Sequence, residues 1–147
     1  GIELASDVHL PHAVVASASY SIHDGKFVNF IQAFGGVPTQ LGGKRFEMSA
    51  KRLASVGITL APQHGLIAHA NVNYSGDRYL NKRNSALAPA FTTIDAGLGY
   101  RIRDTELRID GRNLGNRRDA VSESEFGDAQ YYRMTARTVR VEIVVKY

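Results

Sequence analysis

Arginine and aromatic side chains gather in three stretches that lie between more regular segments of the sequence. Arginine forms charge-assisted hydrogen bonds with anions, and its guanidinium group also binds the faces of aromatic rings. We therefore expect these stretches to supply contacts for an anionic ligand rich in aromatic groups. The candidates of first rank are Arg78, Tyr79, Arg117, Arg118, Tyr131, Tyr132 and Arg133, and Phe27, Phe30, Phe34, Lys82 and Arg83 are further candidates.

A second group of charged residues occupies two neighbouring segments near the C-terminus. Arg108, Asp110 and Arg112 alternate with other residues in "ELRIDGRN", and Arg140 and Glu142 do the same in "TVRVEIVVKY". Alternate residues of a β-strand point to one face, and opposite charges on neighbouring strands pair across that face. The pattern predicts an ion-pair ladder whose role is structural.

Other chemistry has little support in the sequence. His9 and His12 are close enough to share a metal ion, but "HLPH" contains a proline and no further ligands accompany it. The acidic "SESE" at 122–125 is typical of a solvated loop. Cysteine is absent, no nucleophile stands in a motif with a base, and the net charge of +4 is spread along the chain. We expect no enzyme activity, no cofactor and no nucleic-acid partner.

The elements that must position these residues are β-strands. Six segments alternate apolar and polar residues, which is the pattern of a strand with one apolar and one polar face. The chain also begins in such alternation, and its first residue is Gly, which suggests a piece of a longer protein. The six segments are 13–24, 54–61, 66–75, 93–102, 106–113 and 138–147.

The connections between these strands alternate between short and long. Short turns lie at "PQHG" and "RDT", and long links at about 24–45, 77–90 and 115–133. An antiparallel up-and-down meander therefore has all its short turns at one end and its long loops at the other. The stretch "FEMSAKRLASV" fits either a short amphipathic helix or the outer part of a long strand, and we favour the strand.

The function depends on which way the apolar face turns. A soluble barrel or sandwich turns it inward, whereas an outer-membrane barrel turns it towards lipid. Strands of about 10 residues match the hydrocarbon layer of a membrane. Tyr74 and Tyr79 near the long loops, with Tyr100 and Tyr147 near the short turns, fit two aromatic girdles. These features favour lipid, and a soluble binding module remains the alternative.

Several motifs in the second half of the chain occur together in one known family. "YSGDRY" (74–79) precedes "APAFTTIDAGLGYRI" (88–102), "ELRIDGRNLGNRRD" (106–119) and a final segment that ends in Tyr147. Their order and spacing resemble the C-terminal end of a TonB-dependent outer-membrane receptor. The likeness covers about residues 46–147 well and the first 45 loosely. Asp119 departs from the family pattern, which usually has an aromatic residue there.

The resemblance implies an all-β fold, namely the C-terminal part of a 22-stranded transmembrane β-barrel in the bacterial outer membrane. Residues 1–147 would be the last segment of the barrel, with the plug domain and earlier strands absent. The implied function is TonB-dependent uptake, most often of ferric siderophores, although a passive porin-like channel is an alternative. The implied partners are the plug, the remaining strands, TonB through the missing N-terminal region, and outer-membrane lipid and lipopolysaccharide.

The last strand has a function of its own in this interpretation. Terminal strands of outer-membrane proteins, with their final aromatic residue, resemble the signal read by the barrel-assembly machinery. The corresponding positions are Val139, Val141, Ile143, Val145 and Tyr147. If this end is periplasmic, the short turns are periplasmic too and the long loops are extracellular.

Overall fold

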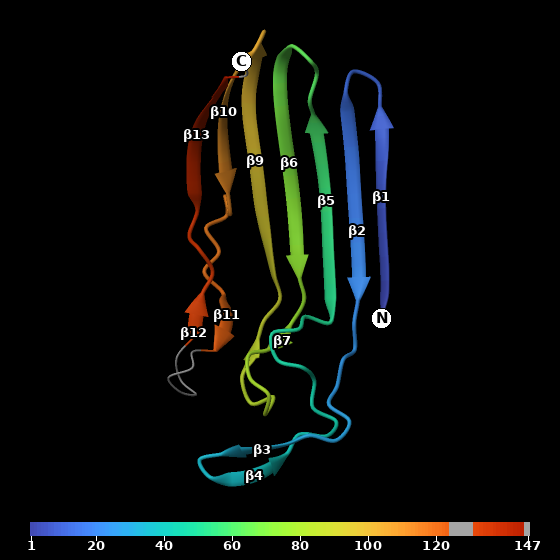
Figure 1. The fold of residues 1–147 in the computed structure, drawn as a ribbon, viewed down its shortest axis with the longest axis vertical. Helices are drawn as coiled ribbons and strands as arrows, with labels where there is room; N and C mark the ends of the chain where they lie inside the picture. Colours follow the sequence, from blue (N-terminus) through green and yellow to red (C-terminus); the bar gives the residue numbers. More distant parts are fainter. Residues whose placement is uncertain (124–130, 146–147) are drawn as a thin grey trace.

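The computed structural model describes residues 1–123 and 131–145. Its main element is one antiparallel sheet in which the seven long strands lie in sequence order, as in an up-and-down meander (Figure 1). The predicted meander is therefore confirmed. Its strands are β1 (Ile2–Leu10), β2 (Val14–Ile22), β5 (Arg52–Leu60), β6 (Gly65–Ser75), β9 (Phe91–Ile102), β10 (Thr105–Arg112) and β13 (Thr138–Val145).

The sheet has one strand more than the six that we predicted. The additional strand is β1, which pairs along its whole length with β2, from Ile2 opposite Ile22 to Leu10 opposite Val14. Its alternation is weak because Ser6 stands on its apolar side and Ala5 on its polar side. Pairing with β2 extends this segment, although its own pattern is only a partial strand signal.

Short and long connections alternate strictly, as predicted. Turns of a few residues join β1 to β2, β5 to β6 and β9 to β10, and all three lie at one end of the sheet (Figure 1). The long loops lie at the other end. We call these ends the short-turn end and the long-loop end. The last described residues also lie at the short-turn end.

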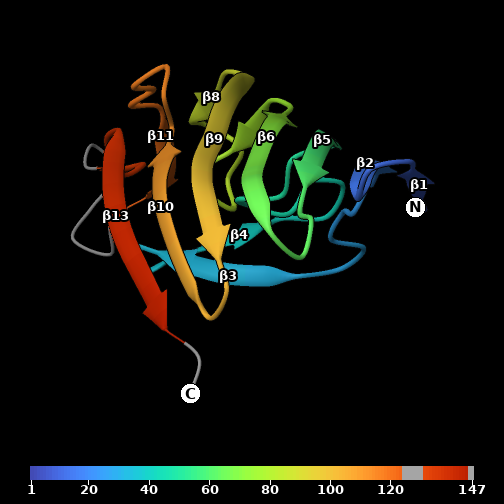
Figure 2. The same cartoon turned by 90° about the horizontal axis from the view of Figure 1, so that it is seen from above.

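The long loops contain short hairpins of their own. Figure 2 shows that the sheet is curved and that the hairpin of β3 and β4 lies on its concave side. The other hairpins stay near the strands that they connect. The loop strands are β3 (Ile31–Phe34), β4 (Val37–Gln40), β7 (Arg78–Tyr79), β8 (Leu87–Ala88), β11 (Ala120–Glu123) and β12 (Tyr131–Arg133).

The stretch before β5 is neither of the two structures that we considered. No helix forms there, and the strand begins only at Arg52, so the expected outer extension from Phe46 was wrong. Met48 has a φ of 56°, which an extended strand cannot accommodate. Its N–H donates to the carbonyl oxygen of Tyr79 at 2.7 Å. The backbone thus turns to bind the neighbouring loop instead of continuing the sheet.

The seven strands have an apolar face and a polar face, and the register keeps each face continuous from strand to strand. Val56, Val72 and Ile94 are direct neighbours on the apolar face, for example. All three are exposed, with accessible fractions of 61%, 44% and 46%. In the described part of the chain, nothing covers this face. The soluble alternative requires these apolar side chains to converge on a closed core. They do not do so.

Residues that are buried lie mainly among the loops. Leu41 is fully buried, and Leu80 and Ala88 are nearly so. These side chains hold the loop segments together rather than the sheet. No helix among the described residues has the length and apolar character needed to cross a membrane.

Candidate binding site on the polar face and the long loops

Ion pairs on the polar face form a continuous chain across β9, β10 and β13. Arg101 binds Glu106 with its Nη2 2.7 Å from Oε2, and Arg108 lies 3.3 Å from Oε1 of the same carboxylate. Arg108 also binds Glu142, with 2.6 Å between Nη2 and Oε2. Arg140 approaches the same Glu142 oxygen at 3.5 Å. One arginine thus joins two carboxylates that belong to two different strands.

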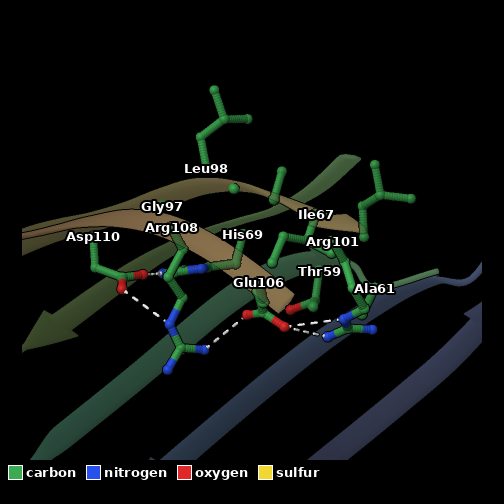
Figure 3. Close-up of a pocket in the computed structure, with 13 residues that line it drawn as sticks. Thr59, Ala61, Ile67, His69, Gly97, Leu98, Arg101, Glu106, Arg108 and Asp110 are labelled. Atoms are coloured by element: carbon green, nitrogen blue, oxygen red, sulfur yellow. Dashed lines mark hydrogen bonds and ion pairs between the residues drawn. The ribbon is translucent and has the colours of Figure 1, made fainter. Parts of the chain in front are cut away.

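The chain extends sideways through Asp110. Its Oδ2 lies 3.5 Å from Nε of Arg108, and its Oδ1 lies 3.8 Å from Nε2 of His69 on β6 (Figure 3). Leu98 points to the opposite side of the sheet in the same view. These side chains border a cavity of about 160 Å³ near the short-turn end. The polar face therefore carries both cationic and anionic side chains that a neighbouring segment or solute can contact.

Two glycines allow the charged side chains to lie flat on the sheet. A Cβ on Gly97 would lie 2.3 Å from Cε1 of His69 and 2.4 Å from Oδ1 of Asp110. A Cβ on Gly99 would lie 2.6 Å from the carbonyl oxygen of Leu107. Both glycines are on the polar face of β9, so their missing side chains leave the room that the ion pairs occupy.

The predicted ion-pair ladder forms, but with a partly different set of residues. Arg108, Asp110, Arg140 and Glu142 are brought together as predicted, but the side chain of Arg112 makes no hydrogen bond or ion pair within residues 1–123 and 131–145. Arg112 opposes the uncharged Thr138 in the register. It lies with Thr93, Asp95 and Thr138 around a cavity of about 470 Å³. Its guanidinium group is exposed and able to meet a solute or another segment.

Three members of this network were not predicted from the sequence, namely Arg101, Glu106 and His69. The signal for Arg101 and Glu106 was present, because they follow the same alternation and flank the turn at 103–104. His69 could not be found from its own strand. Its partner Asp110 is two strands away, and the two meet only because Gly97 separates them without a side chain.

The loops at 24–51 and 77–90 are bound to each other and form what we call the loop unit. Asn84 recognises the backbone of Arg45 twice, since its Oδ1 accepts from the Arg45 N–H at 2.8 Å and its Nδ2 donates to the Arg45 carbonyl at 2.9 Å. Asn84 has a φ of 55°, which asparagine tolerates better than most residues. Lys82 donates to Gln32 at 3.2 Å across the same contact.

Aromatic rings strengthen the loop unit. Phe27 stacks on Phe30 with 5.0 Å between ring centroids, and Phe46 meets the edge of Phe27 at 4.8 Å. The cations of Lys82 and Arg83 lie 5.7 Å and 5.0 Å from the rings of Phe30 and Phe34. The cationic and aromatic side chains that we expected to contact a ligand here contact each other instead.

Arg78 is buried rather than presented at a loop surface. Only 4% of the residue is exposed, and its guanidinium carbon lies 4.9 Å from the centroid of Phe91. Its Nη2 donates to the carbonyl oxygen of Ala120, which connects β7 to β11. Burial lowers the pKa of Arg78, and the nearby Asp119 carboxylate partly opposes that shift. These contacts make Arg78 a link between two loops.

The remaining predicted contacts lie in different settings. Tyr79 is half-buried, with the Arg45 guanidinium carbon 5.4 Å from the centroid of its ring, unlike the exposed Tyr74 with which we expected it to form an aromatic girdle. Arg117 forms a two-point pair with Asp119, with both N–O distances 2.8 Å, and this hydrogen bonding raises its pKa. Arg118 is exposed. Tyr131, Tyr132 and Arg133 form the exposed strand β12.

Other sequence-based expectations concern metal ions and the C-terminus. In the described ranges, no group of three or more histidine or acidic residues is arranged to hold a metal ion. Val139, Val141, Ile143 and Val145 lie on the apolar face of β13 and are exposed. Tyr147, the aromatic end of the predicted assembly signal, lies outside the described residues, as does the second half of "SESE".

Comparison with known proteins gives a consistent assignment. The family model described as "TonB dependent receptor-like, beta-barrel" matches residues 1–114. This match includes the first 45 residues, where the motif resemblance was loose, and ends before the final loop and strand. No curated protein sequence matches this chain.

Solved structures of similar fold include three receptors. The siderophore receptor PiuA from Acinetobacter baumannii has a TM-score of 0.81 at 21% identity, over 99% of this chain and 21% of its own. The ferric yersiniabactin uptake receptor FyuA from Yersinia pestis has a TM-score of 0.80 at 16% identity, over 99% of this chain and 23% of its own. The ferric-catecholate import receptor Fiu from K12 E. coli has a TM-score of 0.73 at 15% identity, over 97% of this chain and 20% of its own. The chain thus spans about a fifth of the length of these receptors.

Proposed function

This chain belongs to the TonB-dependent receptor family, whose members are outer-membrane transporters and not enzymes, and from that membership we propose that it takes part in the uptake of ferric siderophores. The sheet is a segment of the receptor barrel. Its apolar face meets lipid and its polar face borders the lumen. Residues 1–147 would form the C-terminal part, completed by earlier strands and a plug domain.

The observation that carries the siderophore assignment is the likeness over nearly the whole chain to three receptors whose names all refer to siderophores or ferric chelates. The chemistry of the long loops agrees with it. Tyr132 and Arg133 on β12 and Arg118 beside it are exposed, and Arg112 leaves a guanidinium group free on the polar face. Arginine and tyrosine together suit anionic chelates with aromatic groups.

The other predicted partners follow from the same proposal. The plug would lie against the polar face, and TonB would act through the N-terminal region that precedes this chain. The barrel-assembly machinery would read the last strand through Val139, Val141, Ile143, Val145 and Tyr147. Lipopolysaccharide would surround the long-loop end from outside.

An uptake assay tests the proposal. The full-length receptor is expressed in cells that lack other iron receptors, and uptake of radioactive iron is measured with catecholate, hydroxamate and α-hydroxycarboxylate siderophores. We expect uptake of at least one, dependent on TonB, and a higher KM in a Tyr132→Ala, Arg133→Ala variant. Arg103→Ala in a short turn is the control. Uptake without TonB would indicate a passive channel, and uptake of cobalamin alone would contradict the iron assignment.

A further inference from the structure

The apolar face carries one charged side chain within its seven described strands, and it belongs to Arg52. The register places Arg52 opposite Ile22, on the same face as Ala54 and Val56. The other positions of this face are aliphatic, tyrosine, hydroxyl-bearing or glycine residues. An arginine that faces lipid is costly at the bilayer centre and costs little near the interface. The location of Arg52 along the strand therefore matters.

Arg52 is the first residue of β5, at the long-loop end (Figure 1). Ala54, two residues further along, is paired with Tyr20 on one side and Tyr74 on the other. Both tyrosines are exposed on the apolar face, and rows of tyrosine mark the headgroup level of a membrane. Two strand residues extend about 7 Å. The backbone position of Arg52 is therefore beyond the tyrosine row on the side of the long loops, where the proposed orientation places the lipid headgroups.

Arg52 is also free to bind. Its side chain is exposed and makes no hydrogen bond or ion pair within the part of the chain that the structure describes. Gly76 lies beside it, donating its N–H to the Arg52 carbonyl oxygen at 2.8 Å, and a Cβ on Gly76 would be 3.6 Å from that of Arg52. The neighbouring position on β6 thus has no side chain that could obstruct a ligand.

A second arginine stands at the same end. Continuing the alternation of β13 from Val139 places Arg137 at the next position of the apolar face, one residue before the strand, and it is exposed. At the short-turn end, by contrast, the apolar face of β1, β2, β5 and β6 finishes with leucine or valine. Among the described residues, the cations on this face are therefore confined to the side of the long loops.

We propose that Arg52 binds a phosphate group of the glycolipid in the outer leaflet of the outer membrane, and that Arg137, which three strands of the sheet separate from β5, binds a phosphate of a neighbouring glycolipid. The proposal rests on the orientation under "Proposed function", in which the long loops are extracellular. Charge complementarity carries it, because an exposed cation beyond the tyrosine row suits the phosphates of lipopolysaccharide. The contact would fix the depth of this part of the barrel in the membrane.

Native mass spectrometry of the full-length receptor in detergent tests the proposal with two probes, bisphosphorylated lipid A and its dephosphorylated form. Arg52→Ala should weaken binding of the phosphorylated lipid about fivefold. Arg52→Lys should restore most of it, and the double variant with Arg137→Ala should be weaker still. The matched control is Arg112→Ala, which removes an exposed arginine from the same end of the sheet but from the polar face.

Three results would overturn the proposal. They are equal affinity of wild type and Arg52→Ala, equal losses in Arg52→Ala and Arg112→Ala, and a similar loss with dephosphorylated lipid. Each variant is first shown to be folded by its heat-modifiable electrophoretic mobility. Iron uptake is measured separately, and Arg52→Ala should retain it. A wild type that transports no siderophore would contradict the proposed function while leaving the lipid comparison valid, since that comparison needs only a folded barrel.

Discussion

On the apolar face, neighbours such as Val56 and Val72 lie side by side without any polar contact, whereas on the polar face Ser55 donates to Asn73 at 2.9 Å and Asn71 donates to Asn73 at 3.1 Å. The same two strands, β5 and β6, make both surfaces. The apolar face obtains its stabilisation from lipid, which adapts to any apolar shape. The polar face obtains its stabilisation from specific partners, which depend on exact fit to the sheet.

This difference means that the two faces should tolerate different substitutions. The apolar face should resist charge but accept changes in apolar shape. The polar face should accept charge but resist changes in volume wherever side chains lie over glycine. Substitutions on each face of the full-length receptor test that contrast.

The largest effect is expected from a charge at the centre of the apolar face. Ala70 lies midway along β6 and is exposed on that face, opposite Ile58 and Ala96. Ala70→Arg should lower the free energy of unfolding by about 2–4 kcal/mol, because it places a guanidinium group near the bilayer midplane. Urea titration of the receptor folded in phospholipid vesicles measures the change.

The control places the same residue on the polar face. Ser19 on β2 is exposed there and opposite Ala5 and Ser55. Ser19→Arg should change the free energy of unfolding much less than Ala70→Arg. Equal losses in the two variants would contradict the assignment of one face to lipid and the other to a polar lumen.

A smaller loss should follow from adding volume to the polar face. In Gly99→Ala the new Cβ would lie 2.6 Å from the Leu107 carbonyl oxygen and 2.7 Å from Cβ of Arg108. Overpacking of this kind costs about 1–3 kcal/mol, and the backbone oxygen cannot move without disturbing β10. Gly115→Ala, in open space, is the control. If both variants unfold at the same urea concentration, the close fit over Gly99 is not a constraint.

These two faces also explain what the sequence could predict. Alternation was sufficient for the meander, the two faces and most of the ladder, because each is a local property of a strand. The pairing of His69 with Asp110 was not predictable in this way, since it depends on the register of three strands and on Gly97 between them. Arg112 has the same alternation as Arg108 but opposes Thr138, and only the register shows that.

The loops were less predictable from the sequence. The residue types in each loop were evident, but the residues of other loops that they would contact were not. Arg78 was expected at a ligand surface, yet it is buried over Phe91. Nothing in "YSGDRY" indicates that Phe91 and Ala120 will lie beside it. Similarly, the positive φ of Met48 follows from its hydrogen bond to Tyr79 in another loop. Contacts between distant loops determine these details.

The loop unit should show a local effect rather than a global one. Asn84→Gly keeps a residue that tolerates positive φ but removes both hydrogen bonds to the Arg45 backbone. The loss of two hydrogen bonds at about 1 kcal/mol each, about 2 kcal/mol together, predicts faster hydrogen exchange near Arg45, by roughly thirtyfold, with little change in the sheet. The control is Asn29→Ala, which removes a hydrogen bond from Gln40 within the loop at 24–51 but no hydrogen bond to the loop at 77–90. Unchanged exchange near Arg45 would show that the two loops are not joined through Asn84.

The smallest effect is expected from the ion pair of Arg108 and Glu142, which lies on the polar face where water and salt have access. A double-mutant cycle of Arg108→Gln and Glu142→Gln should give a weak favourable coupling at about 0.1 M salt that fades towards about 1 M, because salt shortens the range of charge interactions. The cycle of Arg112→Gln and Glu142→Gln is the control, since Arg112 makes no contact with Glu142 in the described structure, and it should give no coupling. If the coupling energy between Arg108 and Glu142 persists unchanged at high salt, the pair is shielded from solvent. The polar face would then resemble a packed interior more than the wall of a lumen.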